Sequence, residues 1–303
     1  MPKIKFMHQV VLTSVIAALL LFVANTAVWA NRAIFDTDTF TTTAVTSITS
    51  EPSRQALAQE VVDRALADRP IAKRVAGNTA TKLVSGLLGT SQFEEILNKA
   101  VGKLQVYLTS NEQKSISLDL AGIKGTVETL LTVAGNNGAN TENATDRLNN
   151  IPNELVIVNA DNIPSFYTYG LVFLWLGPIC ALLAVALLVY PYLRDRSQYY
   201  KVAMIQGAFL VLTGLLSLLV GPLVRPPALA KVASPNMRVV VGNLYDSFIA
   251  IFNQQAYWLI GAGLLLALVP LAVRYGLKLA NKRSAAKSSA KPVAKTTAKN
   301  KKK

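Results

Sequence analysis

The chain has 303 residues, of which 51% are hydrophobic and 16% are charged, and its formal net charge at pH 7 is +14. Charged residues make up roughly a quarter of an ordinary soluble domain, so this charged fraction is low for a soluble protein. Residues 274–303 hold 11 Lys and Arg and no acid, whereas residues 31–165 hold 12 bases and 15 acids. The positive charge therefore belongs mainly to one tail, which excludes a basic nucleic-acid-binding domain as its source.

Four apolar stretches contain no Lys, Arg, Asp or Glu, and they lie at residues 10–30, 170–190, 202–223 and 256–273. Each is close to the ~20 residues that a helix needs to cross a ~30 Å hydrocarbon core. Because lipid cannot satisfy unpaired backbone groups, such stretches must be helices. We therefore predict an all-α membrane protein with transmembrane helices at 1–30, 166–193, 202–224 and 256–276.

Basic residues near the ends of these helices set the expected orientation. Lys3 and Lys5 precede the first helix, the 194–201 loop carries three bases, and the 277–303 tail is rich in lysine. Such residues favour the cytoplasmic side of a plasma membrane. We therefore expect a multi-pass protein whose two termini and 194–201 loop are cytoplasmic. The segments expected outside the cytoplasm are 31–165 and 225–255, although the second of these also carries three bases.

The first helix has two interpretations. Lys3 and Lys5 could form the basic start of a cleaved signal peptide, with Val28-Trp29-Ala30 as a small-residue cleavage site. The apolar run is longer than the 7–15 residues of a usual signal-peptide core. We therefore favour a retained signal anchor.

The exported segment 31–165 is 135 residues long, large enough for one small core. Ser50 followed by Pro52 predicts the start of a helix, because proline is tolerated in a first helical turn. Pro70 predicts the end of that helix and the start of the next. The segment is therefore predicted to be a mainly helical extracytoplasmic domain.

The second half of this segment continues with one helix and two short strands. Ser91 with Glu94 has the spacing of a capping box, and apolar residues follow it at helical spacing. Residues 116–120 alternate apolar and polar side chains, which predicts a strand, and 155–158 is a second strand candidate.

Short motifs follow one another along the first two thirds of the chain: Trp29-Ala30-Asn31, Phe35-Asp36-Thr37-Asp38-Thr39-Phe40, Ser50-Glu51-Pro52, Ser117-Leu118-Asp119-Leu120, and Ile151-Pro152 with Leu155-Val156-Ile157-Val158. Together they resemble a loosely defined group of uncharacterised bacterial multipass membrane proteins. In that group a helical extracytoplasmic domain lies between the first membrane helix and a C-terminal helix cluster. The resemblance covers most of residues 1–200 and implies this architecture in a bacterial plasma membrane. It implies no activity and no catalytic residue.

Side chains suited to catalysis or metal binding are few. Cys180, the single cysteine of the sequence, lies inside an apolar run, where we interpret it as a buried structural residue. His8, the single histidine, lies at the cytoplasmic end of the first helix, away from the exported domain. That position excludes a Ser-His-Asp triad or a His-ligated zinc in the domain. We therefore predict no enzyme, no catalytic residue, no cofactor and no metal site.

Small residues mark candidate packing positions in the third and fourth helices, at Gly207, Gly214, Ser217, Gly221, Gly261 and Gly263. The three glycines of the third helix recur every seven residues and thus share a face. A stripe of small residues lets a neighbouring helix approach closely. We therefore predict that these positions pack against another membrane helix.

The 225–255 segment carries apolar residues at helical spacing from Val241 to Phe252, with polar residues on the other face. This pattern predicts an amphipathic helix. It would lie either on the outer membrane surface or under the exported domain.

The 277–303 tail repeats an Ala-Lys pair every four residues, with lysines at Lys287, Lys291, Lys295 and Lys299. Its charge density and Pro292 predict disorder. Each base near an anionic leaflet contributes ~1 kcal/mol of attraction, so we predict that these lysines bind the lipid surface. Nucleic acid is the weaker alternative, because no aromatic residue is available for base stacking.

Taken together, these features favour a non-catalytic envelope scaffold or sensor that acts through its extracytoplasmic domain. A protein partner or a second copy of the chain is then expected. The alternative is a subunit of a small-molecule or lipid transporter, because prolines such as Pro178 and Pro270 predict kinked helices that can line a path.

Overall fold

The computed structural model describes residues 3–67, 70–111, 116–119, 125, 154–158 and 167–289. Its elements, in chain order, are α1 (Lys3–Ala30), a π-helical turn η1 (Asn31–Phe35), α2 (Thr37–Thr49), α3 (Glu51–Ala65), α4 (Pro70–Leu87), α5 (Ser91–Thr109), β1 (Ile116–Asp119), β2 (Glu154–Val158), α8 (Tyr167–Arg194), a 3-10 turn η2 (Arg196–Gln198), α9 (Tyr199–Ala230) and α10 (Pro235–Ser289). Four stretches are helical, long and apolar enough to cross a membrane: Phe6–Phe35, Tyr167–Arg194, Tyr199–Ala230 and Pro235–Lys278. The prediction of four helices suited to span a membrane is therefore confirmed.

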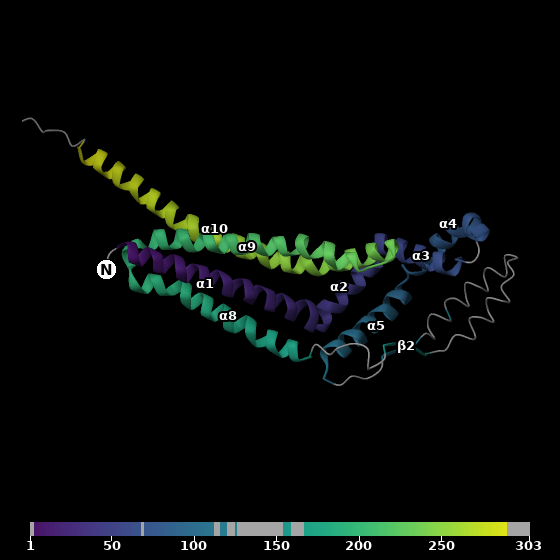
Figure 1. The fold of residues 1–303 in the computed structure, drawn as a ribbon. Helices are drawn as coiled ribbons and strands as arrows, with labels where there is room; N and C mark the ends of the chain where they lie inside the picture. Colours follow the sequence, from purple (N-terminus) through teal and green to yellow (C-terminus); the bar gives the residue numbers. More distant parts are fainter. Residues whose placement is uncertain are drawn as a thin grey trace, which may run out of the picture.

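The four long helices run side by side, and the shorter helices lie beyond the end of this bundle that is opposite the N-terminus (Figure 1). Within the bundle α1 packs against α8 and α9, and α9 pairs with α10. Helices α2 to α5 are called the end domain below. The end domain contacts the bundle chiefly where α2 and α3 meet α10.

The passage from α1 into the end domain is held by polar contacts. Asp36 caps α2, because its Oδ1 accepts a hydrogen bond from the Thr39 amide at 2.8 Å. Gln105 of α5 is only 1% exposed. Its Nε2 donates to the carbonyls of Ile34 at 3.1 Å and Phe35 at 3.2 Å, and its Oε1 accepts from the Thr37 hydroxyl at 2.9 Å. These bonds fix α5 to the point where the chain leaves α1.

Local signals account for most helix starts in the end domain. Ser50 immediately precedes α3, which has proline in its first turn, and Pro70 is the first residue of α4. The predicted cap of α5 was wrong by one residue. Thr90, in an extended conformation, accepts from the Phe93 amide at 3.3 Å, so Ser91 is already helical.

Residues 116–119 and 154–158, where short strands were expected, pair as an antiparallel ladder. The register runs from Ile116 opposite Val158 to Asp119 opposite Glu154, with an irregularity after Ile116.

The last helix differs most from expectation. The amphipathic helix expected within 225–255 and the transmembrane helix expected at 256–276 are one element, the 55-residue α10. No proline lies between Pro235 and Pro270, so nothing in the backbone forces a break where the apolar run begins. The helix also extends through Ser289, into the tail expected to be disordered from residue 277.

Of the two placements expected for the amphipathic segment, the structure has it against the end domain. Leu244 and Phe248 of α10 pack on a cluster of Ala44 and Val45 from α2 and Val101 from α5. This cluster is the apolar core that the end domain shares with the bundle.

Small residues bring α9 and α10 into close contact. A Cβ placed on Gly207 would lie 2.6 Å from the carbonyl oxygen of Gly263, and one placed on Gly263 would lie 2.7 Å from that of Gly207. A Cβ on Gly214 would lie 2.8 Å from the Ala256 oxygen. These separations are shorter than an ordinary van der Waals contact, so only glycine fits without moving the neighbouring helix.

The other candidate packing positions behave differently from one another. A Cβ on Gly221 would lie 3.0 Å from Ile249, a tight contact with a side chain. Ser217 is buried and donates to the carbonyl of Thr213 in its own helix at 2.9 Å. A Cβ on Gly261 would have no heavy atom of another element within 4 Å, so the close approach does not include it.

Gly263→Ala and Gly261→Ala form a matched pair for testing this contact. The methyl group at residue 263 must displace the α9 backbone, and such overpacking costs about 1–3 kcal/mol. The methyl group at residue 261 meets open space and gains helix propensity, roughly 0.5–1 kcal/mol. We expect thermal unfolding in detergent micelles to show a lower Tm for Gly263→Ala and an equal or higher Tm for Gly261→Ala. Equal Tm values for the two variants would contradict the contact.

Candidate functional site

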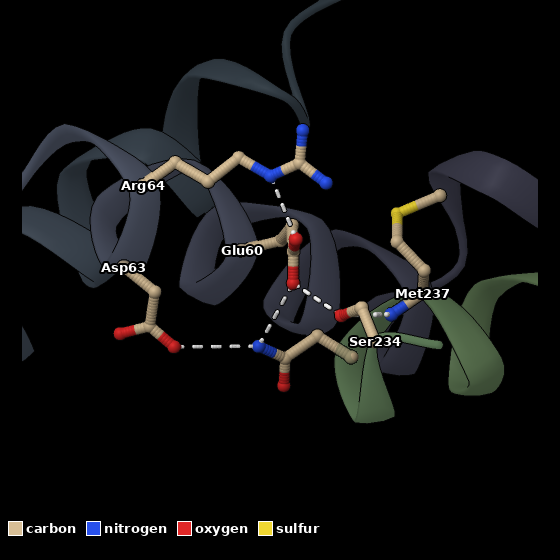
Figure 2. A network of polar contacts seen from close by, with 6 residues as sticks. Glu60, Asp63, Arg64, Ser234 and Met237 are labelled. Atoms are coloured by element: carbon tan, nitrogen blue, oxygen red, sulfur yellow. Dashed lines mark hydrogen bonds and ion pairs between the residues drawn. The ribbon is translucent and has the colours of Figure 1, made fainter. Parts of the chain in front are cut away.

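A polar network joins the end domain to the start of α10 (Figure 2). The carboxylate of Glu60 on α3 accepts from the hydroxyl of Ser234 at 2.5 Å and from the guanidinium of Arg64 at 2.8 Å. The Ser234 hydroxyl in turn accepts from the Met237 amide at 3.3 Å, and so caps α10. Asn236 adds longer contacts to Glu60 at 3.4 Å and to Asp63 at 3.5 Å.

The electrostatics of this network favour an ionised Glu60. The hydrogen bond from Ser234, followed by that from Arg64, holds the pKa of the Glu60 carboxyl below its usual range. The carboxylate also lies at the N-terminal end of α10, where the helix dipole favours negative charge. A general base works best with a pKa near the working pH. The arrangement is therefore suited to holding α3 against α10, and poorly suited to proton transfer.

A second polar contact lies further along the same two helices. Ser53 of α3 is fully buried, and its hydroxyl oxygen accepts from the Asn243 side-chain amide of α10 at 3.0 Å. Ser50 and Ser53 hydroxyls are 3.1 Å apart. Contacts at Ser234 and at Asn243 together set the direction of α3 along α10.

Aromatic residues join α1 and α2 to α10 nearby. The indole Nε1 of Trp29 donates to the carbonyl of Phe248 at 2.9 Å, and the Trp29 ring meets Phe252 edge-on at 5.7 Å between centroids. The rings of Phe40 and Phe248 are 5.4 Å apart. The same stretch of α10, from Phe248 to Phe252, is thus contacted both by α1 and by the end domain.

An apolar groove of about 650 Å³ opens at this junction. Its walls come from α1, η1, α2, α9 and α10, and include Phe22, Trp29, Phe40, Val220, Leu244 and Phe248. A second groove of about 390 Å³ lies between α1 and α9 and shares Phe22 with the first. The larger groove is within the ~300–1,000 Å³ range of small-molecule sites.

The residues proposed from sequence lie elsewhere. The glycines of α9 and Gly263 of α10 form the contact between these two helices, and none of them lines the groove. Lys287 lies near the end of α10, whereas Lys291, Lys295 and Lys299 lie outside the described residues, so lipid binding by the tail stays a prediction. Cys180 is buried and unbonded to another cysteine. Among the described residues, no group of three or more His, Cys, Asp or Glu could hold a metal ion.

Sequence reasoning missed the junction itself. Glu60 and Ser234 are 174 residues apart, and Gln105 is about 70 residues from its partners, so no local pattern announces these contacts. Trp29 is easily located at the end of an apolar run. Nothing in the neighbouring sequence indicates that its indole donates a hydrogen bond to α10.

Comparison with known proteins finds no matching protein family, no matching curated protein and no matching solved structure. The class of the protein therefore comes from its own features. The described residues form a predominantly helical protein with four candidate membrane-spanning helices.

Glu60→Gln tests the polar network through its pH dependence. Because the pKa of Glu60 is lowered on folding, its contribution to stability is present above about pH 4.3, the usual glutamate value, and is lost as the pH falls through the lowered pKa. We expect the native protein to have a higher Tm than Glu60→Gln at pH 7, and the difference to shrink on titration to pH 3.

Glu94→Gln is the control for this titration, since it removes the same charge from an exposed position of α5. We expect it to change Tm less than Glu60→Gln at pH 7, and the two variants to approach each other as the pH falls to 3. A Tm difference for Glu60→Gln that does not depend on pH would contradict the role of the carboxylate.

Proposed function

We propose that the protein is a non-catalytic scaffold or sensor of the bacterial cell envelope, acting through an extracytoplasmic end domain. The observation that carries the proposal is the continuity of α10. One end of this helix packs on α2, α3 and the Val101 cluster, and its later part pairs with α9 among the apolar spans. Because an α-helix resists compression along its axis, a load on the end domain reaches the membrane helices directly. This is the coupling that a sensor or a rigid scaffold needs.

The proposed orientation places both termini in the cytoplasm and the end domain outside it. Lys3, Lys5 and the basic 194–201 loop support this orientation. The packing of α1 supports a retained signal anchor over a cleaved signal peptide. Val10 is 1% exposed and Ala17 is fully buried, and α1 packs along α8 and α9. Cleavage would leave those two helices without their shared neighbour.

The α4 helix supplies the surface that we propose for a protein partner. It packs on α3 at the far end of the molecule from the N-terminus (Figure 1). Ile71 is 80% exposed and Leu83 is 66% exposed on this helix. Large apolar side chains in water favour association when a matching surface is available. A partner bound here would act on α10 through α3.

The alternative proposal, a lipid or small-molecule transporter subunit, is favoured by the apolar grooves beside α1. It predicts flux of a substrate across vesicles that contain the protein. Failure of any substrate in a broad panel to cross faster than in empty vesicles would count against it.

The scaffold or sensor proposal is tested in cells with the full-length chain and an N-terminal tag. A photo-crosslinking amino acid at Leu83 is expected to capture one envelope protein in stoichiometric amount, and the same amino acid at Glu94 is expected not to. The Leu83→Glu variant is tested with the photo-crosslinking amino acid at Ile71 instead. It is expected to capture roughly tenfold less of the partner, because burying the carboxylate costs at least ~1.4 kcal/mol of binding. Capture of the chain alone, or of the same proteins from both crosslinker positions, would overturn the proposal.

A further inference from the structure

The larger groove extends from the bundle to Phe40 of the end domain. The Pro235–Lys278 span has 44 residues. Such a helix is ~66 Å long at 1.5 Å per residue, more than twice a ~30 Å hydrocarbon core. Part of it must therefore lie outside the core. Asp246 identifies that part, because it pairs with Arg225 of α9 through two bonds of 2.8 and 2.9 Å, and both side chains are about half exposed.

The lining of the groove extends to both sides of this ion pair. On α10 it begins at Val241, five residues before Asp246, and ends at Phe252. On α1 it reaches Phe22, eight residues or ~12 Å from the end of the apolar run at Ala30. At the other end it reaches Phe40 of the end domain. The groove therefore begins at the depth of lipid chains and continues past the polar boundary.

The chemistry of the lining admits hydrocarbon and disfavours polar ligands. Three lining residues carry polar side-chain atoms, and each uses its hydrogen within the protein. Thr26 donates to the Phe22 carbonyl at 2.9 Å, Trp29 to Phe248 at 2.9 Å, and Tyr245 to Gly221 at 2.8 Å. A polar molecule in the groove would lose its hydrogen bonds to water without replacement, whereas an alkyl chain would lose none.

The smaller groove supplies an entrance from the bilayer. It meets the larger groove at Phe22 and is lined by Leu19, Leu212 and Leu216, each at least 48% exposed on the candidate spans. In a membrane those side chains face acyl chains. A chain can therefore enter sideways between α1 and α9 without crossing a polar region.

From these observations we infer that the two grooves bind the acyl chain of a membrane lipid and draw part of it out of the hydrocarbon core to the end domain. The inference goes beyond the scaffold or sensor proposal, and it holds whether or not the end domain binds a protein partner. It assigns Val241 and Leu244 as the residues that touch the drawn-out part of the chain, since they lie furthest along α10 from the apolar run that begins at Ala256.

The test uses the full-length protein in vesicles of phosphatidylethanolamine and phosphatidylglycerol. A trace of the phosphatidylglycerol carries a diazirine at the end of one acyl chain, and mass spectrometry maps the adducts after irradiation. Bulk lipid is expected to label Leu182 of α8, which is 71% exposed. The inference expects additional adducts at Val241 and Leu244, which bulk chains do not reach. Adducts at Leu182 with none at Val241 or Leu244 would overturn it.

Val220→Trp and Leu219→Trp are the matched variants. Val220 lines the groove, whereas its neighbour Leu219 is 53% exposed and does not. Filling the groove is expected to lower the ratio of Leu244 to Leu182 adducts roughly tenfold, which corresponds to ~1.4 kcal/mol weaker binding. Leu219→Trp is expected to leave the ratio unchanged. An unchanged ratio in a folded Val220→Trp protein would contradict the inference.

Two further outcomes are decisive. If Val220→Trp fails to elute as a folded protein, the adduct map of the native chain decides alone. If a photo-crosslinker at Leu244 joins two copies of the chain instead of lipid, the groove is an interface and the inference is wrong. Neither result depends on capture through Leu83, so failure of the acyl-chain site and failure of the partner proposal are distinguishable.

Discussion

The close backbone contact between Gly207 of α9 and Gly263 of α10 is the constraint on which the remaining structure depends. Lipid chains are as apolar as leucine, so membrane helices gain little from simply hiding apolar surface from lipid. Their association relies on dense packing, which two backbones without Cβ atoms allow. This contact sets the register of α10, and the contacts of Gly214 with Ala256 and of Gly221 with Ile249 follow from it.

Once its register is set, α10 presents the end domain with two different surfaces. Leu244 and Phe248 form an apolar surface that stabilises without demanding one direction. Ser234 and Asn243 form directional hydrogen bonds with Glu60 and Ser53. The apolar contact therefore holds the end domain against α10. The hydrogen bonds of Ser234 with Glu60 and of Asn243 with Ser53 select one orientation of α3. The groove is the space left between α1 and α10 when both requirements are met.

The features that sequence analysis found are those with a local cause. A span is visible because composition alone decides whether a helix can lie in lipid. Pro70 marks a helix start because the first turn of a helix does not need the backbone N–H that proline lacks. The prediction of two helices in place of α10 was wrong. Asn253, Gln254 and Gln255 mark a change in side-chain polarity, but the backbone hydrogen bonds of a helix continue through such a change. The start of the apolar run at Ala256 was taken for the start of a new helix.

The packing residues show where pattern and geometry separate. Gly261 and Gly263 look equivalent in the sequence, but two residues correspond to about 200° around a helix, so they cannot both face α9. The seven-residue spacing of the α9 glycines identified a shared face without identifying the helix opposite. The contact of Glu60 with Ser234 depends on how two segments 174 residues apart pack in the folded protein. A short stretch of sequence does not contain that information.

The core shared by α2, α5 and α10 also dictates an order of assembly. Its first residues, Ala44 and Val45, precede its last, Phe248, by about two hundred positions. Chains emerge N-terminus first at roughly 5–20 residues per second, so the early half waits on the order of ten seconds or more for its cover. During that interval the domain presents an uncovered apolar face, and a protein truncated before α10 keeps that face permanently. Quality control in the cell can therefore recognise a chain that contains α2 and α5 but ends before α10 by this exposed apolar face.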